Sequence, residues 1–247
     1  MRIEFQEQVR IFMSVAAQHR FSGPVTVLHD RRLPVRATPA GYAALIHAFE
    51  LAVPLPLTLL AIGEHHKVTE EAGWRILTPR HAPRPTLEGH LTFALKYEGL
   101  DLAVLKRLLD AVGPGEIEAL VRSKPTGSYA RRIWFLYEWL TGNRLDLPDA
   151  ARGSYVPVVD PKQQYAAVAE TSPRHRVKNN LPGTREFCPL VFRTAALDQF
   201  IAMNLAERAR AIVADVPRHL LARTAGDRKS TRLNSSHPSK SRMPSSA

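Results

Sequence analysis

The sequence contains a single cysteine, Cys188, among its 247 residues. One thiol cannot form a disulfide within the chain, which excludes the small secreted folds that disulfides stabilise and favours a cytoplasmic location. The residues around Cys188, in Phe187-Cys188-Pro189-Leu190, are mostly apolar. We therefore predict a buried structural thiol there rather than a nucleophile with a lowered pKa.

Long apolar runs are also missing. No stretch approaches the roughly 20 apolar residues that a membrane-spanning helix requires. Residues 1–20 carry scattered charges and lack the uninterrupted apolar segment of a secretory signal. Because 45% of the residues are hydrophobic, the chain can nevertheless bury a substantial core. We expect no membrane partner.

Acidic residues are few: 23 Asp and Glu stand against 34 Lys and Arg, which gives a net charge of +11. Such an excess is typical of proteins that bind nucleic acid. The charge is uneven, however, because residues 227–247 contribute +4 and residues 1–37 contribute +3. Residues 38–226 then carry only +4, an ordinary value for their number, so we do not expect nucleic acid as a partner.

Catalytic motifs are absent from the sequence. It contains no phosphate-binding P-loop, no GxGxxG pattern after a strand, no HExxH, no paired CxxC and no GxSxG. The tightest histidine pair is His65-His66, and adjacent residues on a helix point in different directions, so we interpret the pair as surface residues. We predict no catalytic, cofactor-binding or metal-binding residue in this chain.

Helical signals dominate what is present. Thr and Asp residues that can cap a helix precede apolar residues at helical spacing, and Gly and Pro follow them. One strand is predicted at Gly73–Pro79, and residues 145–184 are irregular and rich in proline. The predicted helices cover residues 38–51, 56–66, 86–99, 101–112, 116–123, 128–142 and 194–224. The pattern predicts a mainly α fold: a helical cluster with a few short β-strands and a loop-rich, Pro-containing segment.

Two basic groups stand out. We predict that Arg131 and Arg132 lie on the solvated side of the helix over 128–142. Arg174, Arg176 and Lys178 precede Asn179-Asn180 and a Pro-Gly pair. They could hold an anion such as phosphate through charge and backbone N–H groups, or form a structural turn whose Asn side chains satisfy the backbone. The sequence leaves both alternatives open.

Four blocks, in order, resemble the N-terminal region of Fic-family proteins. They are Leu87–Gly99 (LEGHLTFALKYEG), Pro125–Gly142 (PTGSYARRIWFLYEWLTG), Asn179–Thr184 (NNLPGT) and Phe187–Val191 (FCPLV). The resemblance extends from about Gly41 to Arg223, roughly three-quarters of the chain. These blocks identify the family and are not catalytic motifs.

The resemblance implies the activity of the full-length protein. Fic enzymes transfer AMP from ATP to a hydroxyl group of a target protein, with Mg²⁺ on the phosphates. Their signature is HxFx(D/E)GN(G/K)R, and many carry an inhibitory helix with S/T-x-x-x-E-G/N. Neither pattern occurs in the relevant position here. We therefore expect ATP and Mg²⁺ for the full-length parent and no cofactor for this fragment, which would pack in cis on the missing Fic core or present a target protein to it.

The domain boundaries follow from composition. Residues 1–37 are Arg-rich and form an uncertain extension, and residues 38–226 form the helical domain, which is incomplete at its C-terminal end. Residues 227–247 lack the apolar residues needed for a core, and they resemble a translated sequencing adapter. The alternative to a Fic fragment is a stand-alone basic module that binds nucleic acid or a regulatory partner.

Overall fold

The computed structural model describes residues 21, 25–34, 36–214, 219–220 and 222–223. They belong to two units, residues 1–192 and residues 193–247. In chain order the first unit contains β1 (Val27–Leu28), β2 (Arg31–Arg32), β3 (Ala37–Ala40), α2 (Tyr42–Ala48), β4 (Leu59–Gly63), β5 (Thr69–Glu71), β6 (Trp74–Leu77), the 3₁₀ helix η1 (Pro79–His81), α3 (Leu87–Tyr97), α4 (Leu102–Val112), α5 (Pro114–Ser123), α6 (Ser128–Thr141), β7 (Val156–Pro157), β8 (Glu170–Ser172) and β9 (Val177–Asn179).

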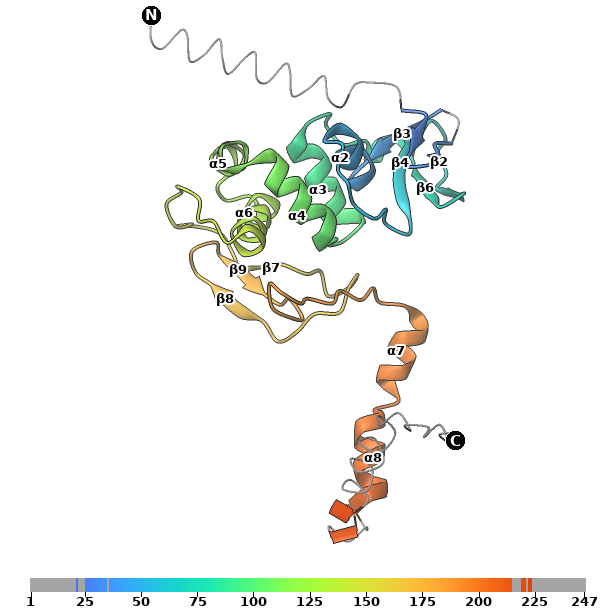
Figure 1. Cartoon of the computed structure of the whole chain (residues 1–247), viewed down its shortest axis with the longest axis vertical. Coiled ribbons are helices and arrows are strands. Elements are labelled where there is room, and N and C mark those ends of the chain that lie inside the picture. The colour runs from blue at the N-terminus through green and yellow to red at the C-terminus, as the bar shows by residue number, and fades with distance from the viewer. Residues whose placement is uncertain (1–20, 22–24, 35, 215–218, 221, 224–247) are drawn as a thin grey trace, which may run out of the picture. The chain divides into compact units, whose positions relative to one another are not determined.

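The helices α2 to α6 form the body of the first unit, next to a four-stranded sheet that contacts α2 and α3 (Figure 1). The sheet has the order β3-β4-β6-β5, with β4 and β6 parallel and the outer pairs antiparallel. Ala37 of β3 pairs with Gly63, and Leu59 of β4 pairs with Trp74. A single large apolar core, which includes Trp74 and Trp134, joins this sheet to the helices.

Helix boundaries follow the capping signals in the sequence. The hydroxyl of Thr86 accepts a hydrogen bond from the Gly89 N–H at the start of α3, and the carboxylate of Asp101 accepts from the second and third N–H groups of α4. Gly142 adopts the left-handed conformation that ends α6, with φ of 76°. These predicted ends are confirmed because each cap satisfies helix-terminal groups that have no partner within the helix.

The Pro-rich segment after α6 contains a three-stranded sheet of order β7-β9-β8, which contacts α6. The side-chain amides of two buried residues hold this segment in place, each through a pair of hydrogen bonds to the backbone of another residue. Gln164 accepts from the Leu100 N–H at 2.8 Å and donates to the Leu100 carbonyl at 2.9 Å. Asn180 does the same with Val159, at 2.8 and 2.9 Å. Each amide thus replaces one step of a strand ladder and satisfies backbone groups buried away from water.

The second unit contains α7 (Ala195–Ala202), capped by the hydroxyl of Thr194, and α8 (Leu205–Ala214). Neither helix buries a side chain. The helical prediction for this region is confirmed for these two spans. The predicted tail over residues 227–247 and most of the extension over residues 1–37 lie outside the described residues.

The prediction of a mainly α fold is wrong, because the described residues form three small sheets and a mixed α and β architecture. The predicted helix start at Thr38-Pro39 is strand β3, where Pro39 is tolerated because β3 is an edge strand. The predicted helix over 56–66 contains strand β4, whose residues Leu59 to Ala61 are all buried. A short run of buried apolar residues has the same pattern in either element.

None of the helices in the described ranges is both long enough and apolar enough to cross a lipid bilayer.

Candidate functional site

Arg174, one of the three predicted anion contacts, is bound by carboxylates of the chain itself. Its guanidinium donates to Glu138 at 2.8 Å, through Nη2, and to Asp149 at 2.8 Å, through Nη1. It also donates to the carbonyls of Leu145 and Leu147 and lies 4.9 Å from the centre of the Trp134 ring. These contacts fill its donor positions, so Arg174 joins the segment after α6 to the helix.

Glu138 is the centre of this buried cluster. Besides Arg174, it accepts hydrogen bonds from the Trp134 ring N–H and the Leu145 N–H, and it contacts His175 Nε2 at 3.0 Å. Burial alone would raise the pKa of Glu138, but the hydrogen bonds from Arg174, Trp134 and Leu145 outweigh it and hold the pKa at about 2. Burial lowers the pKa of His175. A neutral imidazole can donate to Glu138 through Nε2 and accept from the Ser172 hydroxyl through Nδ1, at 2.8 Å.

The other two predicted anion contacts have different surroundings. Arg176 donates to the Ala151 carbonyl at 3.2 Å and lies over the ring of Tyr155. Lys178 is exposed on β9. Each of the three basic side chains therefore has its own environment, and an anion site at Arg174, Arg176 and Lys178 stays a prediction.

Arg131 and Arg132 are not on a solvated face, because their exposed fractions are only 2% and 8%. Arg131 donates to the carbonyls of Ser154 and Arg176, both at 2.9 Å. Arg132 donates twice to the Val158 carbonyl. The pair therefore attaches the three-stranded sheet to α6. The sequence misled because arginine is rarely buried unless its donors are satisfied, and the accepting carbonyls lie more than 20 residues away.

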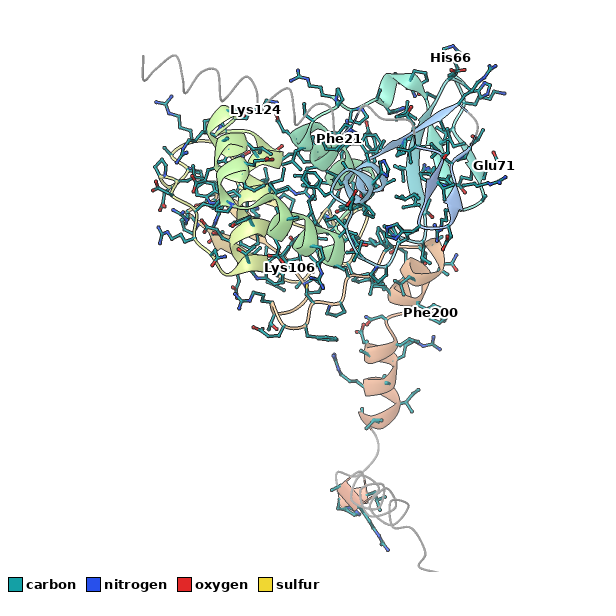
Figure 2. All side chains as sticks on the ribbon, turned by 45° about the horizontal axis from the view of Figure 1, so that its top comes forward. Phe21, His66, Glu71, Lys106, Lys124 and Phe200 are labelled. Atoms are coloured by element: carbon teal, nitrogen blue, oxygen red, sulfur yellow. The ribbon has the colours of Figure 1, made fainter. Side chains whose placement is uncertain are left out.

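A basic groove, which sequence reasoning missed, lies between residues 80–84 and one face of α3. Its volume is about 330 Å³. The end of α5 closes one side through Lys124, which is labelled in Figure 2. The charged side chains in its lining are Arg80, Arg84, Lys96, Lys124 and Glu88, and His81 lies beside them. The available signal was the run of basic residues in Arg80-His81-Ala82-Pro83-Arg84, interpreted only as a loop.

Gly89 allows the 80–84 segment to lie against α3. A Cβ at this position would overlap the backbone carbonyl of Arg84. We expect Gly89→Ala to destabilise the chain by about 1–3 kcal/mol, since overpacking exceeds the gain in helix propensity. Gly115→Ala in α5 is the matched control, because nothing lies within 4 Å of a Cβ there, and it should be neutral or stabilising by up to about 1 kcal/mol. Urea denaturation of both variants measures the difference, and equal effects would contradict the role of Gly89.

A second, more apolar cavity of about 280 Å³ lies beside Trp134, between the end of α5 and residues 147–152. Its lining includes Val121, Pro125 and Pro148. Because Trp134 also contacts the Arg174 and Glu138 cluster, this cavity borders structural contacts of the core.

Metal chemistry finds little support in the described residues. Among them, no group of three His, Cys, Asp or Glu side chains is placed to hold a metal ion. The one carboxylate in the basic groove, Glu88, is already bound by Lys124 at 2.6 Å. Because Mg²⁺ is usually held by only one or two carboxylates together with waters and phosphates, the expectation that this fragment holds no cofactor stays a prediction.

The remaining sequence candidates behave as surface or structural residues. His65 and His66 are exposed in the turn between β4 and β5, as the surface interpretation expects, although the turn is not helical. Figure 2 labels His66. Cys188 is half-buried and packs against the core, and burial raises the pKa of its thiol. A raised pKa disfavours the thiolate that a nucleophile requires.

Comparison of the chain with models of protein families, with curated proteins and with solved structures finds no match in any of the three.

Proposed function

We propose that this chain is the N-terminal region of a Fic-family protein whose full-length form transfers AMP from ATP to a hydroxyl group of a target protein. In this proposal the region works in the cytoplasm, and it supplies structure and presents targets, while the chemistry belongs to a Fic core that follows it in the same protein. The proposal rests on the four blocks of resemblance and on the surface of the second unit.

The observation that carries the proposal is the exposed apolar side of α7 and α8. Phe200 is 59% exposed and Ile212 is 76% exposed. Leu205, which lies between them in the sequence, is 50% exposed. Helices of 8 and 10 residues are marginal in water without packing. Within the described residues of the second unit these apolar side chains are not covered, and packing against a Fic core in cis would bury them.

The four blocks of resemblance also contribute to one apolar core. Leu91 and Leu95 come from the first block, Ile133 and Trp134 from the second, and Leu181 from the third. Cys188 and Leu190, from the fourth, pack against the same core. This shared role supports the interpretation that the blocks are structural rather than catalytic, because each contributes side chains to one contiguous core.

The test is to sequence the source locus across the codon for Gly226. We expect the reading frame to continue into an S/T-x-x-x-E-G/N helix and then HxFx(D/E)GN(G/K)R. The protein made from that frame should transfer label from ATP, labelled at the α-phosphate, to protein hydroxyl groups. Replacing the signature histidine should abolish transfer, because a hydroxyl nucleophile needs a general base.

One result would overturn the proposal. If genomic DNA encodes Asp227–Ala247 and then a stop codon, the adapter interpretation is wrong and no core follows. The stand-alone basic module would then be the better account of the chain.

A further inference from the structure

The groove between residues 80–84 and α3 concentrates positive charge. Arg80, Arg84, Lys96 and Lys124 line it against a single carboxylate, that of Glu88. Concave surfaces lined by one sign of charge focus the electrostatic field and attract ligands of the opposite sign. The groove is therefore suited to an anionic ligand.

Three of the four cations of the groove have no carboxylate partner in the described part of the chain. Within the described residues, Arg80, Arg84 and Lys96 form no ion pair with a carboxylate, and only Lys124 does, with Glu88. Many other surface cations of the chain are paired, as in Arg36–Glu64, Arg75–Glu70, Lys106–Asp110, Arg122–Glu118 and Arg144–Asp149. What distinguishes the groove is that three cations without a carboxylate partner in the described ranges face one hollow.

Residues 80–84, which form the side of the groove opposite α3, are held in place without a ligand. Pro79 and Pro83 restrict their backbone, and the Thr78 hydroxyl is 2.9 Å from His81 Nδ1. The close approach of the Arg84 carbonyl to Gly89 fixes these residues against the helix. A preformed groove lowers the ordering cost of binding.

The aromatic rings at the groove are already covered. Lys96 Nζ lies 4.8 Å from the centre of the Tyr97 ring, and His81 meets the same ring edge-on at 5.6 Å. Phe93 is 4% exposed and packs on Tyr97. Proteins that bind single-stranded nucleic acid stack bases on open aromatic faces, whereas the partly exposed Tyr97 ring of this groove is already in contact with Lys96 and His81. This disfavours a nucleic acid and favours a ligand that presents only negative charge.

The charges are spread along the helix rather than gathered at one point. Lys124 is bound at Glu88, and Lys96 lies eight residues further along α3, which corresponds to about 12 Å at 1.5 Å per residue. An extended peptide covers that distance with roughly four residues, at about 3.3 Å per residue. Several carboxylates in a row match this spacing, whereas a single phosphate would meet only one end.

We propose that the groove formed by residues 80–84, α3 and Lys124 binds an extended acidic segment of another protein, a run of Asp or Glu side chains. This site is independent of the proposed function, since it holds whether or not the chain belongs to the Fic family.

The test is the affinity of the full chain for a fluorescein-labelled hexaglutamate peptide, measured by anisotropy at low salt. The triple variant R80A/R84A/K96A should weaken binding by at least about tenfold, seen as a tenfold rise in Kd. The matched control K67A/R107A/K162A removes three exposed cations outside the groove and should change affinity by less than about twofold. Both variants keep the basic residues 227–247, so nonspecific attraction to them cancels.

A second variant tests the site through a gain of affinity, which misfolding would not produce. Among the described residues that line the groove, Glu88 supplies the only carboxylate, so Glu88→Gln releases Lys124 and should tighten peptide binding by about two- to fivefold. Raising the salt concentration should weaken binding to the chain and to this variant.

Three results would overturn the proposal: no binding of hexaglutamate by the chain, equal losses in the two triple variants, or no gain from Glu88→Gln. A single-stranded oligothymidylate that binds more tightly than hexaglutamate, and is lost only in the groove variant, would also overturn it in favour of a nucleic-acid site.

Discussion

Replacing Glu138 with alanine should destabilise the first unit by about 3–5 kcal/mol, the cost of breaking a buried ion pair by removing one partner. The exposed fractions of the Arg174 and Glu138 side chains are both 14%, and that of His175 is 8%. Without the carboxylate, the Arg174 charge and the Trp134 and Leu145 N–H groups lose an acceptor that water replaces poorly. Urea denaturation at pH 7 measures the loss.

A control variant and a double variant distinguish the contribution of the buried ion pair from the effect of removing any carboxylate. Glu64→Ala removes an exposed partner of Arg36, with side chains 65% and 75% exposed, and should cost less than about 1 kcal/mol. Glu138→Ala combined with Arg174→Met should cost less than the sum of the two single changes, because the second change removes the guanidinium that has lost its buried partner. Additive losses would contradict the coupling.

The same cluster predicts that the chain loses stability at acid pH. The folded pKa of Glu138, about 2, lies below the ordinary value of 4.5. The stability that this carboxylate contributes is therefore fully present above pH 4.5 and is lost as the pH falls towards 2. Glu138→Ala should lack this part of the acid-induced loss.

Local signals in the sequence were sufficient for most helices. Thr86, Asp101, Gly142 and Thr194 lie where the structure begins or ends a helix, because capping depends only on neighbouring residues. The strands were harder because their pairing is non-local. Strand β4 becomes a strand by pairing with β3 and β6, and its apolar residues alone fit a buried helix equally well.

The burial of the arginines and the shape of the basic groove depend on contacts between residues far apart in the sequence, which the sequence alone does not show. Arg132 is buried because Val158, 26 residues later, accepts its hydrogen bonds. Lys124 closes one side of the basic groove because it reaches Glu88 across 36 residues. Taken singly, these side chains are ordinary exposed cations, and only the fold decides which are buried, which are paired and which face a hollow.

Glu98 leads to the second large effect, a loss of stability towards alkaline pH. Its Oε1 is buried without a hydrogen-bond partner in the described part of the chain, while Oε2 accepts from the Tyr42 N–H at 2.9 Å at the start of α2. Burial raises the pKa of Glu98 to about 8, and nearby Asp101 adds to the rise, although the bond from Tyr42 opposes it.

Because the folded pKa is raised, the contribution of Glu98 is fully present below its ordinary pKa of 4.5 and is lost as the pH rises towards 8. Glu98→Gln keeps an oxygen acceptor for Tyr42 and carries no charge, so it should remove this slope. At pH 8 the variant should be more stable than the original chain by roughly 2–4 kcal/mol, because a tenfold change in an ionisation constant is worth about 1.4 kcal/mol. At pH 4 the two should be nearly equal.

Urea denaturation at pH values from 4 to 8 measures this difference. Burial also lowers the pKa of His90, to about 4, which makes folding less favourable at acid pH in both proteins and therefore drops out of the comparison. Glu71→Gln, a change of the same chemistry at an exposed position in β5 (Figure 2), should leave the pH profile unchanged. Parallel profiles for Glu98→Gln and the original chain would mean that Glu98 is ionised in the folded protein at neutral pH, with its charge satisfied at the N-terminus of α2.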